Sequence, residues 1–235
     1  MNNEVERKVL LDSPTMKLAI ERVERYRGKT LSEIAKHLKI PWNAPLESKG
    51  AGGLIGELIL GLQNNALSVP DMQDVAVEVK YLPIYLDKSI PKEPTQITMI
   101  DYLGLVNETW KTASIRKKIA RVFWVGYAVA RRTEKWVQTG YRILGWHLEI
   151  MPERDLEVCG RDWEDIKGFV SNGRADELSC SMGTFLEPKT KGRDSNDRRA
   201  APGPRENQIM ARRRAFYFKK AYTKTRIIPQ ILERS

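Results

Sequence analysis

Residues 69–80 read VPDMQDVAVEVK, and this segment is the most informative part of the chain for both fold and chemistry. From residue 75 onward, every second position is a valine. Because successive side chains of a β-strand point to opposite faces, the alternation predicts a strand at 75–80 with its valines on one face. Glu78 and Lys80 then project together from the other face. The valine-rich composition favours an internal strand of a sheet.

The sequence on either side predicts helices first, then a cluster of strands, then helices again. Ser13 followed by Pro14 is typical of a helix cap and first turn, and Thr30 with Glu33 has the spacing of a capping box. Residues 189–214 are rich in charged residues, Gly and Pro, and we expect a mobile basic loop there. The expected helices lie at 14–26, 30–40, 54–62, 161–171 and 224–233, and the further strands at 97–100, 121–129, 141–150 and 215–222. This order is typical of a mixed α/β or α+β fold.

The charge balance of the chain points to a polyanionic partner. The 235 residues include 40 Lys and Arg against 30 Asp and Glu, which gives a net charge of +10. An excess of this size favours nucleic acid as the simplest partner. No apolar run is long enough for a transmembrane helix, and the N-terminus does not resemble a signal peptide. We therefore expect a cytoplasmic protein that does not bind membranes.

The cysteines and histidines exclude several kinds of site. Cys159 and Cys180 are the only cysteines, too few for a disulfide scaffold or a four-thiolate zinc site. His37 and His147 leave little room for a histidine-based metal site or a Ser-His-Asp triad. Any catalytic chemistry is therefore expected from carboxylates and lysines.

Acidic residues around the predicted strand suit metal-dependent hydrolysis. Asp71 precedes Glu78 by seven positions, and two nearby carboxylates can hold a hard cation such as Mg²⁺. Such an ion polarises a phosphodiester and lowers the pKa of a bound water, while Lys80 can orient that water. Glu57 lies among apolar residues in LIGELIL, where an acidic side chain is unusual. A role as a third carboxylate ligand of the same metal would explain its presence there. On spacing alone the pattern is weak, and a solvated strand face with a surface ion pair is the main alternative.

Six blocks of the sequence resemble, in the same order, the MutH family of PD-(D/E)xK nucleases, which includes restriction enzymes of the Sau3AI type. The blocks are TLSEIAKHLKI at 30–40, KGAGGLIGELILG at 49–61, PDMQDVAVEVKYLPI at 70–84, IRKKIARVFWV at 115–125, RDWEDIKGFVSNG at 161–173 and AFYFKKAYT at 215–223. The resemblance implies a restriction-endonuclease-like core, with a central mixed sheet flanked by helices, and two lobes around a DNA cleft. Both lobes would draw on several parts of the chain, so that residues 1–235 form one MutH-like endonuclease domain without a clean boundary.

The resemblance also implies a role for each residue of the site. Asp71, Glu78 and Glu57 would hold Mg²⁺, with Mn²⁺ able to substitute for it, and Lys80 would be the catalytic lysine. Lys118, in the IRKK segment, matches a further active-site lysine of the family. A solvated basic helix end is the alternative for Lys118.

Residues that match the family's DNA contacts lie in three segments. Lys49 and Gly50 match a loop that contacts the target bases. Tyr217 matches a tyrosine that lies against the target adenine and senses its methylation. Pro188 and Lys189 match the end of an Arg-Pro-Lys recognition loop. The alternative for Lys49 and Gly50 is an ordinary glycine-rich helix entry. The alternative for Tyr217 is an aromatic side chain of the core.

Glu187 departs from the family pattern, because it stands where the arginine of that loop is expected. A carboxylate cannot donate to guanine O6 and N7, whereas arginine does so with two hydrogen bonds. Arg193, Arg198 or Arg199 can supply the missing donor, and the sequence does not decide between them. The arginine-rich stretch at 205–214 is interpreted as a phosphate contact, which positions DNA without reading its sequence.

By the same resemblance, the leading hypothesis is a Mg²⁺-dependent DNA endonuclease of methyl-directed mismatch repair. It would act as a monomer on double-stranded DNA and nick the unmethylated strand at hemimethylated GATC sites. MutL would activate it after MutS finds a mismatch. The second hypothesis is a type II restriction endonuclease that cuts both strands at a short site, which Glu187 and the unusual 189–214 segment favour. The third is a basic DNA-binding module with an inert acidic cluster, which metal-dependent strand scission would exclude.

Overall fold

The computed structural model describes residues 3–43, 48–62, 69–129, 140–194, 196–204 and 207–233. The fold is mixed α/β, as the sequence predicts. The chain forms two compact units, the first built from 1–93, 121–150 and 223–235, and the second from 94–120 and 151–222. Because the chain passes between the units four times, neither is a continuous segment.

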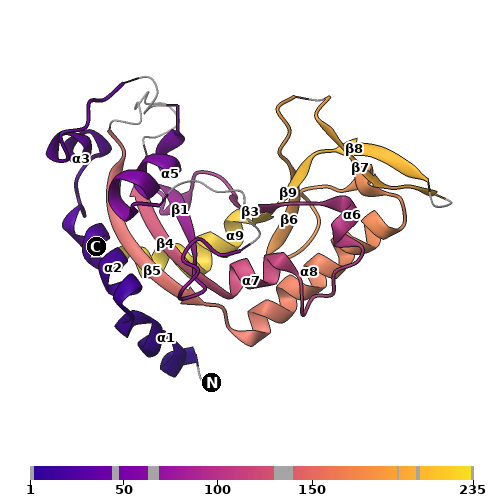
Figure 1. The fold of residues 1–235 in the computed structure, drawn as a ribbon, viewed down its shortest axis with the longest axis horizontal. Coiled ribbons are helices and arrows are strands. Elements are labelled where there is room, and N and C mark those ends of the chain that lie inside the picture. Colours follow the sequence, from indigo (N-terminus) through magenta and orange to yellow (C-terminus); the bar gives the residue numbers. More distant parts are fainter. Residues whose placement is uncertain are drawn as a thin grey trace. The chain divides into compact units, whose positions relative to one another are not determined.

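A four-stranded sheet in the order β2-β1-β4-β5 forms the centre of the first unit (Figure 1). The sheet is mixed, since β1 (Glu78–Tyr85) runs parallel to β4 (Arg121–Ala128), while β2 (Ile90–Pro91) and β5 (Arg142–Ile150) are antiparallel edge strands. Seven of the eight residues of β4 are buried, as expected of a strand with neighbours on both sides. Strand β1 lies between β2 and β4, which confirms the internal position predicted for the valine-rich strand.

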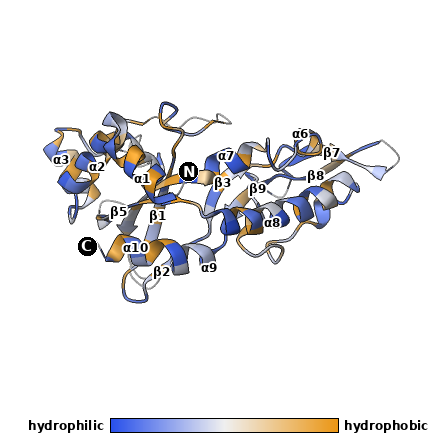
Figure 2. Cartoon of the chain, turned by 90° about the horizontal axis from the view of Figure 1, so that it is seen from below, coloured by the Kyte–Doolittle hydropathy of each residue, from blue (hydrophilic) through white to orange (hydrophobic). Residues whose placement is uncertain are grey.

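Helices cover both faces of this sheet. Phe123 and Val125 pack into a core shared with the N-terminal helices, while Gly126 faces the C-terminal helix. A Cβ at Gly126 would lie 2.8 Å from Ile231 Cγ2, so this glycine allows close packing there. Figure 2 shows α1 and α10 on opposite sides of the strands. The helical segments of this unit are α1 (Asn3–Asp12), α2 (Pro14–Arg25), α3 (Leu31–His37), α5 (Gly50–Ile55), the π-helix η1 (Gly56–Leu60), the π-helix η5 (Thr223–Ile227) and α10 (Ile228–Leu232).

The second unit is built on an antiparallel sheet in the order β3-β9-β6. The long helix α8 (Glu153–Ser171) packs against β6 and buries Trp163 and Ile166 (Figure 1). The remaining elements are β3 (Thr95–Met99), β6 (Leu186–Thr190), β9 (Arg214–Phe218), the β7 (Arg198–Pro202) and β8 (Gln208–Arg212) ribbon, α6 (Tyr102–Leu105), α7 (Ser114–Ala120), the 3-10 helix η3 (Ala175–Glu177) and α9 (Lys220–Tyr222). Throughout the described ranges, no helix is long and apolar enough to cross a membrane.

Both predicted helix starts near the N-terminus are confirmed. Ser13 Oγ accepts a hydrogen bond from the Met16 N–H, and Pro14 occupies the first turn of α2. Thr30 and Glu33 form the predicted capping box, in which the Thr30 hydroxyl accepts from the Glu33 N–H and the Glu33 carboxylate accepts from the Thr30 N–H. Helix α1 was not predicted.

Three predicted elements have the wrong extent. The strand expected at 75–80 begins only at Glu78, because residues 73–76 form a turn closed by two backbone hydrogen bonds between Met72 and Val77. Helix α8 begins at Glu153 rather than at 161. The strand expected at 215–222 ends at Phe218, where the chain turns into α9.

The prediction of a mobile loop at 189–214 is wrong, since half of this segment is strand. It contains the end of β6, the β7–β8 ribbon and the start of β9. Only Ala201 and Ala211 are buried within the ribbon, which is held by backbone pairing and therefore leaves little hydropathy signal. Arg205 lies outside the described residues.

Replacing Thr30 by Ala removes the hydroxyl of the capping box. We expect the free energy of unfolding to fall by about 1 kcal/mol, because an N–H at the start of α3 loses its partner. Urea denaturation measures the change. Thr30→Ser keeps the hydroxyl and serves as the control, so an equal loss in both variants would contradict the capping role.

Candidate functional site

The Asp71 carboxylate is held at the start of β1. The turn at 73–76 reverses the chain, with Ala76 in the left-handed region at φ 52°, and brings Asp71 back beside the strand. Asp71 Oδ2 accepts a hydrogen bond of 3.0 Å from the Val79 N–H. Asp71 is therefore fixed next to the backbone of the residue that follows Glu78.

Glu78 and Lys80 form a buried ion pair on β1. Lys80 Nζ lies 2.7 Å from Glu78 Oε1, and the two side chains are 15% and 2% exposed. The predicted shared face is confirmed by this contact. A carboxylate buried to this degree is costly unless it is paired, so the contact with Lys80 stabilises Glu78 in this position. The alternative of a solvated strand face is wrong for this pair.

Tyr81 packs between this strand and the helix α5. A Cβ at Gly52 would lie 3.1 Å from Tyr81 Cδ2, and one at Gly56 would lie 2.6 Å from the Tyr81 hydroxyl. Burial raises the pKa of Tyr81, and the negative charges of Asp71 and Glu78 raise it further. The two carboxylates are thus close enough to act on one phenol. Sequence reasoning missed Tyr81, although glycines four residues apart mark one helix face on which a bulky group can pack.

Glu57 is not in the surroundings that the sequence indicated. Its side chain is 44% exposed and forms an ion pair with Lys49, while its apolar neighbours face the core on the other side of the helix. The argument that Glu57 is an acid in an apolar environment is therefore wrong. Lys49 precedes α5, and Gly50 has a φ of 69°, which favours glycine at this position.

Asp71 and Glu78 fit a magnesium ion by the chemistry of their donors. Mg²⁺ commonly uses one or two protein carboxylates and takes its other ligands from water and substrate phosphate. Within the residues that the structure describes, no three acidic, histidine or cysteine side chains are grouped so that they could hold a metal. The arrangement thus supports two carboxylate ligands, with Glu57 outside the group.

Lys118 lies on α7 in the second unit and is buried. The expectation of a solvated basic helix end is therefore wrong for this lysine.

A row of polar side chains crosses the sheet of the second unit. Gln96 and Glu187 are the two cross-strand partners of Tyr217. Because partners in antiparallel strands share a face, the three side chains lie in one line, with Lys189 two residues further along β6. Lys189 Nζ lies 5.7 Å from the centre of the Tyr217 ring. We call Gln96, Tyr217, Glu187 and Lys189 the polar row.

The first residues of β6 are fixed by Asp162 of α8. The buried Asp162 carboxylate accepts hydrogen bonds of 2.7, 2.7 and 2.9 Å from the N–H groups of Thr184, Phe185 and Leu186. In the middle of the strand, Arg214 Nη1 donates to the Pro188 carbonyl at 3.2 Å. Strand β6, which carries Glu187 and Lys189, is therefore held at its start and at its middle by charged side chains. Sequence reasoning missed both residues, and an acid beside Trp163 on the inner face of α8 was the available signal.

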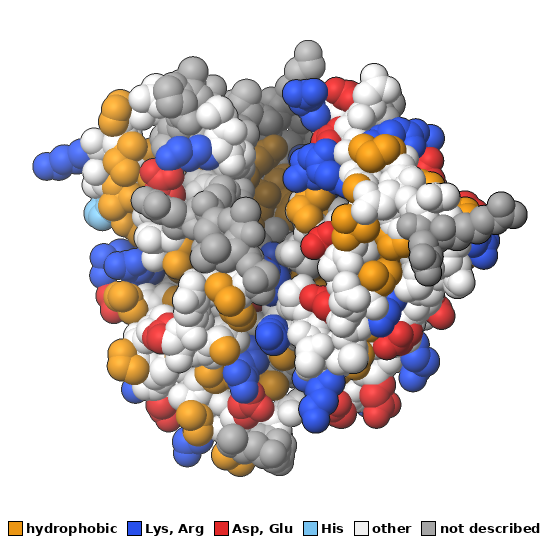
Figure 3. Space-filling view, turned by 45° about the vertical axis from the view of Figure 1, so that its right-hand side comes forward, with side chains coloured by type: hydrophobic (Ala, Val, Ile, Leu, Met, Phe, Trp, Pro, Cys, Tyr) orange, Lys and Arg blue, Asp and Glu red, His pale blue; other side chains and the backbone are white. Residues whose placement is uncertain are grey.

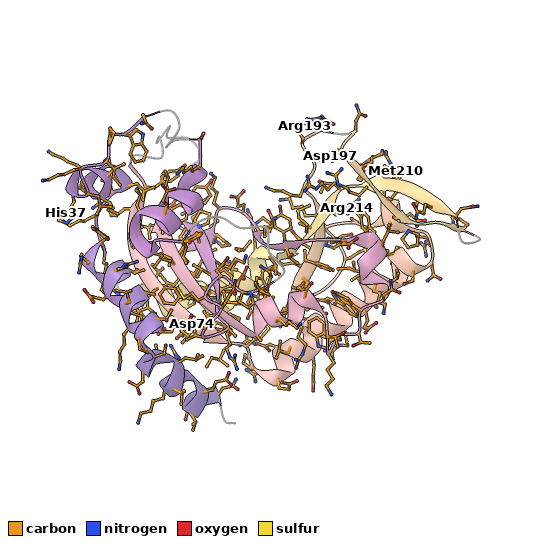
Figure 4. The ribbon with its side chains drawn as sticks, in the orientation of Figure 1. His37, Asp74, Arg193, Asp197, Met210 and Arg214 are labelled. Carbon is orange, nitrogen blue, oxygen red and sulfur yellow. The ribbon has the colours of Figure 1, made fainter. Side chains whose placement is uncertain are left out.

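The three arginines considered as replacement donors have different surroundings. Arg193 is 89% exposed. Arg198 pairs with Asp176, and Arg199 pairs with Asp197 at 2.7 Å. Figure 4 shows Arg193 and Asp197 in the same stretch before β7. Arg193 also pairs with an acid, Asp194 at 3.3 Å, so all three side chains are partly neutralised, and Arg193 is the most exposed of the three.

Basic and acidic side chains are interspersed on the molecular surface. Figure 3 shows Lys and Arg next to Asp and Glu over most of the visible face. On this face basic and acidic side chains therefore lie together, and local geometry has to supply any specificity.

Comparison with known proteins identifies the family. The family model described as DNA mismatch repair enzyme MutH matches residues 60–159. A DNA mismatch repair protein MutH of Yersinia enterocolitica is 30% identical over 207 residues, which cover 86% of this chain and 88% of that protein. The chain belongs to the MutH family. MutH proteins of Actinobacillus pleuropneumoniae and Pectobacterium atrosepticum are 27% and 28% identical, and each match covers 87% of this chain and 89% or 87% of the relative.

Membership of the MutH family confirms the resemblance drawn from the six sequence blocks. The segment that matches the MutH model contains Asp71, Glu78, Lys80 and Lys118. The mixed sheet around β1 agrees with the fold expected of a MutH family member. The polar row lies outside this matched segment, apart from Gln96.

Replacing Asp162 by Asn leaves one acceptor oxygen for three backbone N–H groups. We expect the free energy of unfolding to fall by about 2 kcal/mol, because hydrogen bonds to a charged group are lost and a buried N–H is left without a partner. Urea denaturation measures the loss, and hydrogen exchange at 184–186 locates it. Asp165→Asn, on the exposed side of the same helix, is the matched control. Equal stability of the two variants would refute the anchoring role.

Proposed function

We propose that this MutH family member is a Mg²⁺-dependent DNA endonuclease of methyl-directed mismatch repair. The observation that carries the proposal is the grouping of Asp71, Glu78 and Lys80 at the start of β1, in a chain of the MutH family. Two carboxylates and a lysine at one end of an internal strand suit phosphodiester hydrolysis on a basic protein.

Each residue of the group has a distinct part in the mechanism. Asp71 and Glu78 would hold the metal ion through carboxylate oxygens. When bound, the ion polarises the phosphodiester and lowers the pKa of a water. Lys80 orients the attacking water and stabilises negative charge on the phosphate, while its pairing with Glu78 keeps it in position. Lys118 supports this charge stabilisation, and Mn²⁺ substitutes for Mg²⁺.

We also propose the substrate and partners of the reaction. The chain would act as a cytoplasmic monomer on double-stranded DNA and nick the unmethylated strand at hemimethylated GATC sites, after activation by MutL once MutS finds a mismatch. Lys49 and Gly50 at the entry to α5 would contact bases, as would Pro188 and Lys189. Tyr217 would sense adenine methylation. The mismatch repair names of the relatives support the pathway.

A restriction endonuclease on the same scaffold is the second candidate. Glu187, an acid where the family resemblance leads us to expect an arginine, is the observation that favours it. Such an enzyme would cut both strands at a short site.

Removing the charge of Asp71 should abolish strand scission. Asp71→Asn keeps an oxygen that can accept from the Val79 N–H but loses a metal ligand charge, so we expect at least about a 100-fold loss of nicking rate with DNA binding retained. Nicking of a supercoiled plasmid in Mg²⁺ and filter binding in EDTA are the measurements. Asp74→Asn is the matched control, because this acid lies in the adjoining turn and contacts Thr15 (Figure 4). Wild-type nicking by Asp71→Asn would exclude the assigned role.

Methylation of the substrate separates the two nuclease candidates. Four duplexes with one GATC site, methylated on neither strand, on the top, on the bottom or on both, are incubated in Mg²⁺ with and without MutL. We expect incision only of unmethylated strands, with stimulation by MutL. Methylation-blind or double-strand cutting, or cutting at another sequence, would instead establish the restriction enzyme. Binding without scission in Mg²⁺ and Mn²⁺ would leave a non-catalytic module.

A further inference from the structure

Glu187 is a buried carboxylate without a protein partner. Its side chain lies in β6, and the residue is 8% exposed. Throughout the part of the chain that the structure describes, no hydrogen bond or ion pair involves this carboxylate. Asp162, which is equally buried in the same unit, accepts three hydrogen bonds. Asp162 therefore holds the backbone of the fold through its carboxylate, whereas the Glu187 carboxylate makes no such contact with the described residues.

The surroundings of Glu187 are basic. Burial raises the pKa of its carboxyl, while the positive charges of Lys219, Lys189 and Lys220 act in the opposite direction. None of these lysines forms an ion pair with Glu187. Their positive charges nevertheless act on its carboxylate and offset part of its negative charge. The Glu187 oxygens are not among the fully enclosed polar atoms that lack a partner in the described residues, so they remain open to a ligand that brings a donor.

The position of Glu187 connects this acceptor to DNA contacts. It lies directly opposite Tyr217 and on the same face of the sheet as Lys189. Leu186 and Phe218 are paired on the opposite face and fully buried. The polar row therefore occupies a face that is separate from the apolar core of this sheet.

The chemistry of base edges limits what Glu187 can contact. A carboxylate only accepts hydrogen bonds, so guanine, which shows two acceptors in the major groove, is excluded. Adenine offers its N6 amino group beside the N7 acceptor, which repels a carboxylate. Cytosine offers its N4 amino group without an acceptor on its own major-groove edge, and it is the base that Glu and Asp recognise by this geometry.

We propose that Glu187 determines specificity by accepting a hydrogen bond from the N4 amino group of a cytosine in the target site. The proposal rests on the proposed function, because it takes DNA as the substrate. In GATC the cytosine is paired with guanine, so Glu187 reads from the cytosine the same base pair that an arginine reads from the guanine. Glu187 is then compatible with a GATC site and needs no replacement donor.

The first test changes only the DNA. Duplexes with one GATC site carry 2-pyrimidinone in place of cytosine, 7-deazaguanine in place of guanine, or purine in place of adenine. Fluorescence anisotropy in EDTA measures the dissociation constants without any requirement for catalysis. We expect 2-pyrimidinone, which lacks the N4 amino group, to weaken binding about tenfold, and 7-deazaguanine, which lacks N7, to have little effect. Equal affinity for the natural and 2-pyrimidinone duplexes would overturn the proposal.

The second test combines the DNA change with Glu187→Ala. If the carboxylate and the amino group are partners, Glu187→Ala binds the natural duplex less tightly and no longer distinguishes it from the 2-pyrimidinone duplex. Glu177→Ala, which removes an exposed acid of the same unit, should discriminate as the wild type does. Glu187→Ala should also be at least as stable as the wild type in urea, because the carboxylate makes no hydrogen bond or ion pair with the described residues that the change could break. Discrimination that survives in Glu187→Ala would refute the assignment.

The outcomes for Glu187 and for the endonuclease are separable. A protein that discriminates the N4 amino group in EDTA but nicks no duplex in Mg²⁺ supports the Glu187 contact and refutes the proposed catalytic function. A protein that nicks GATC sites but binds the natural and 2-pyrimidinone duplexes equally supports the proposed catalytic function and refutes the Glu187 contact.

Discussion

A carboxylate that is removed from water needs a donor or a cation, and the ion pair between Glu78 and Lys80 meets this requirement on a single strand. Because side chains two apart share a face, the pair needs no distant partner and forms wherever β1 forms. The strand is held in turn by β4, with Glu78 opposite Val122. Asp71 joins the pair only because the turn at 73–76 returns it to the backbone of Val79. The chemistry of the first unit thus depends on one internal strand and one turn.

In the second unit, a buried carboxylate is stabilised by backbone donors instead of a lysine. Asp162 is satisfied by three backbone N–H groups, so its charge fixes where β6 begins. Arg214 then holds the Pro188 carbonyl, although burial lowers the pKa of its guanidinium. Both contacts position the backbone of β6, the strand that carries Glu187 and Lys189. Rigid support of this kind gives a recognition strand its precision, since the contacting groups do not have to be ordered on binding.

Local patterns in the sequence were sufficient for some of these features. The shared face of Glu78 and Lys80 and the capping box at Thr30 were predictable, because each depends on a spacing of two or three residues. The Asp71 contact was not, because the valine alternation from residue 75 conceals a turn that requires Ala76 in the left-handed region. Asp162 binds N–H groups that are 22 to 24 residues away, and the β7–β8 ribbon is held by backbone pairing. Neither depends on side-chain periodicity, so periodicity could not reveal them.

The contrast between Glu78, Asp162 and Glu187 is the most informative comparison within the chain. All three are buried acids, and the first two are matched by a lysine and by backbone donors. Glu187 has only the distant field of three lysines, which reduces the cost of its charge without supplying a hydrogen bond. The same lysines would offset the repulsion between this carboxylate and DNA phosphates, which is the main physical objection to an acid on a DNA-reading strand. An acid in a recognition strand is therefore tolerable only together with such a basic setting, and the lysines near β6 and α9 provide it.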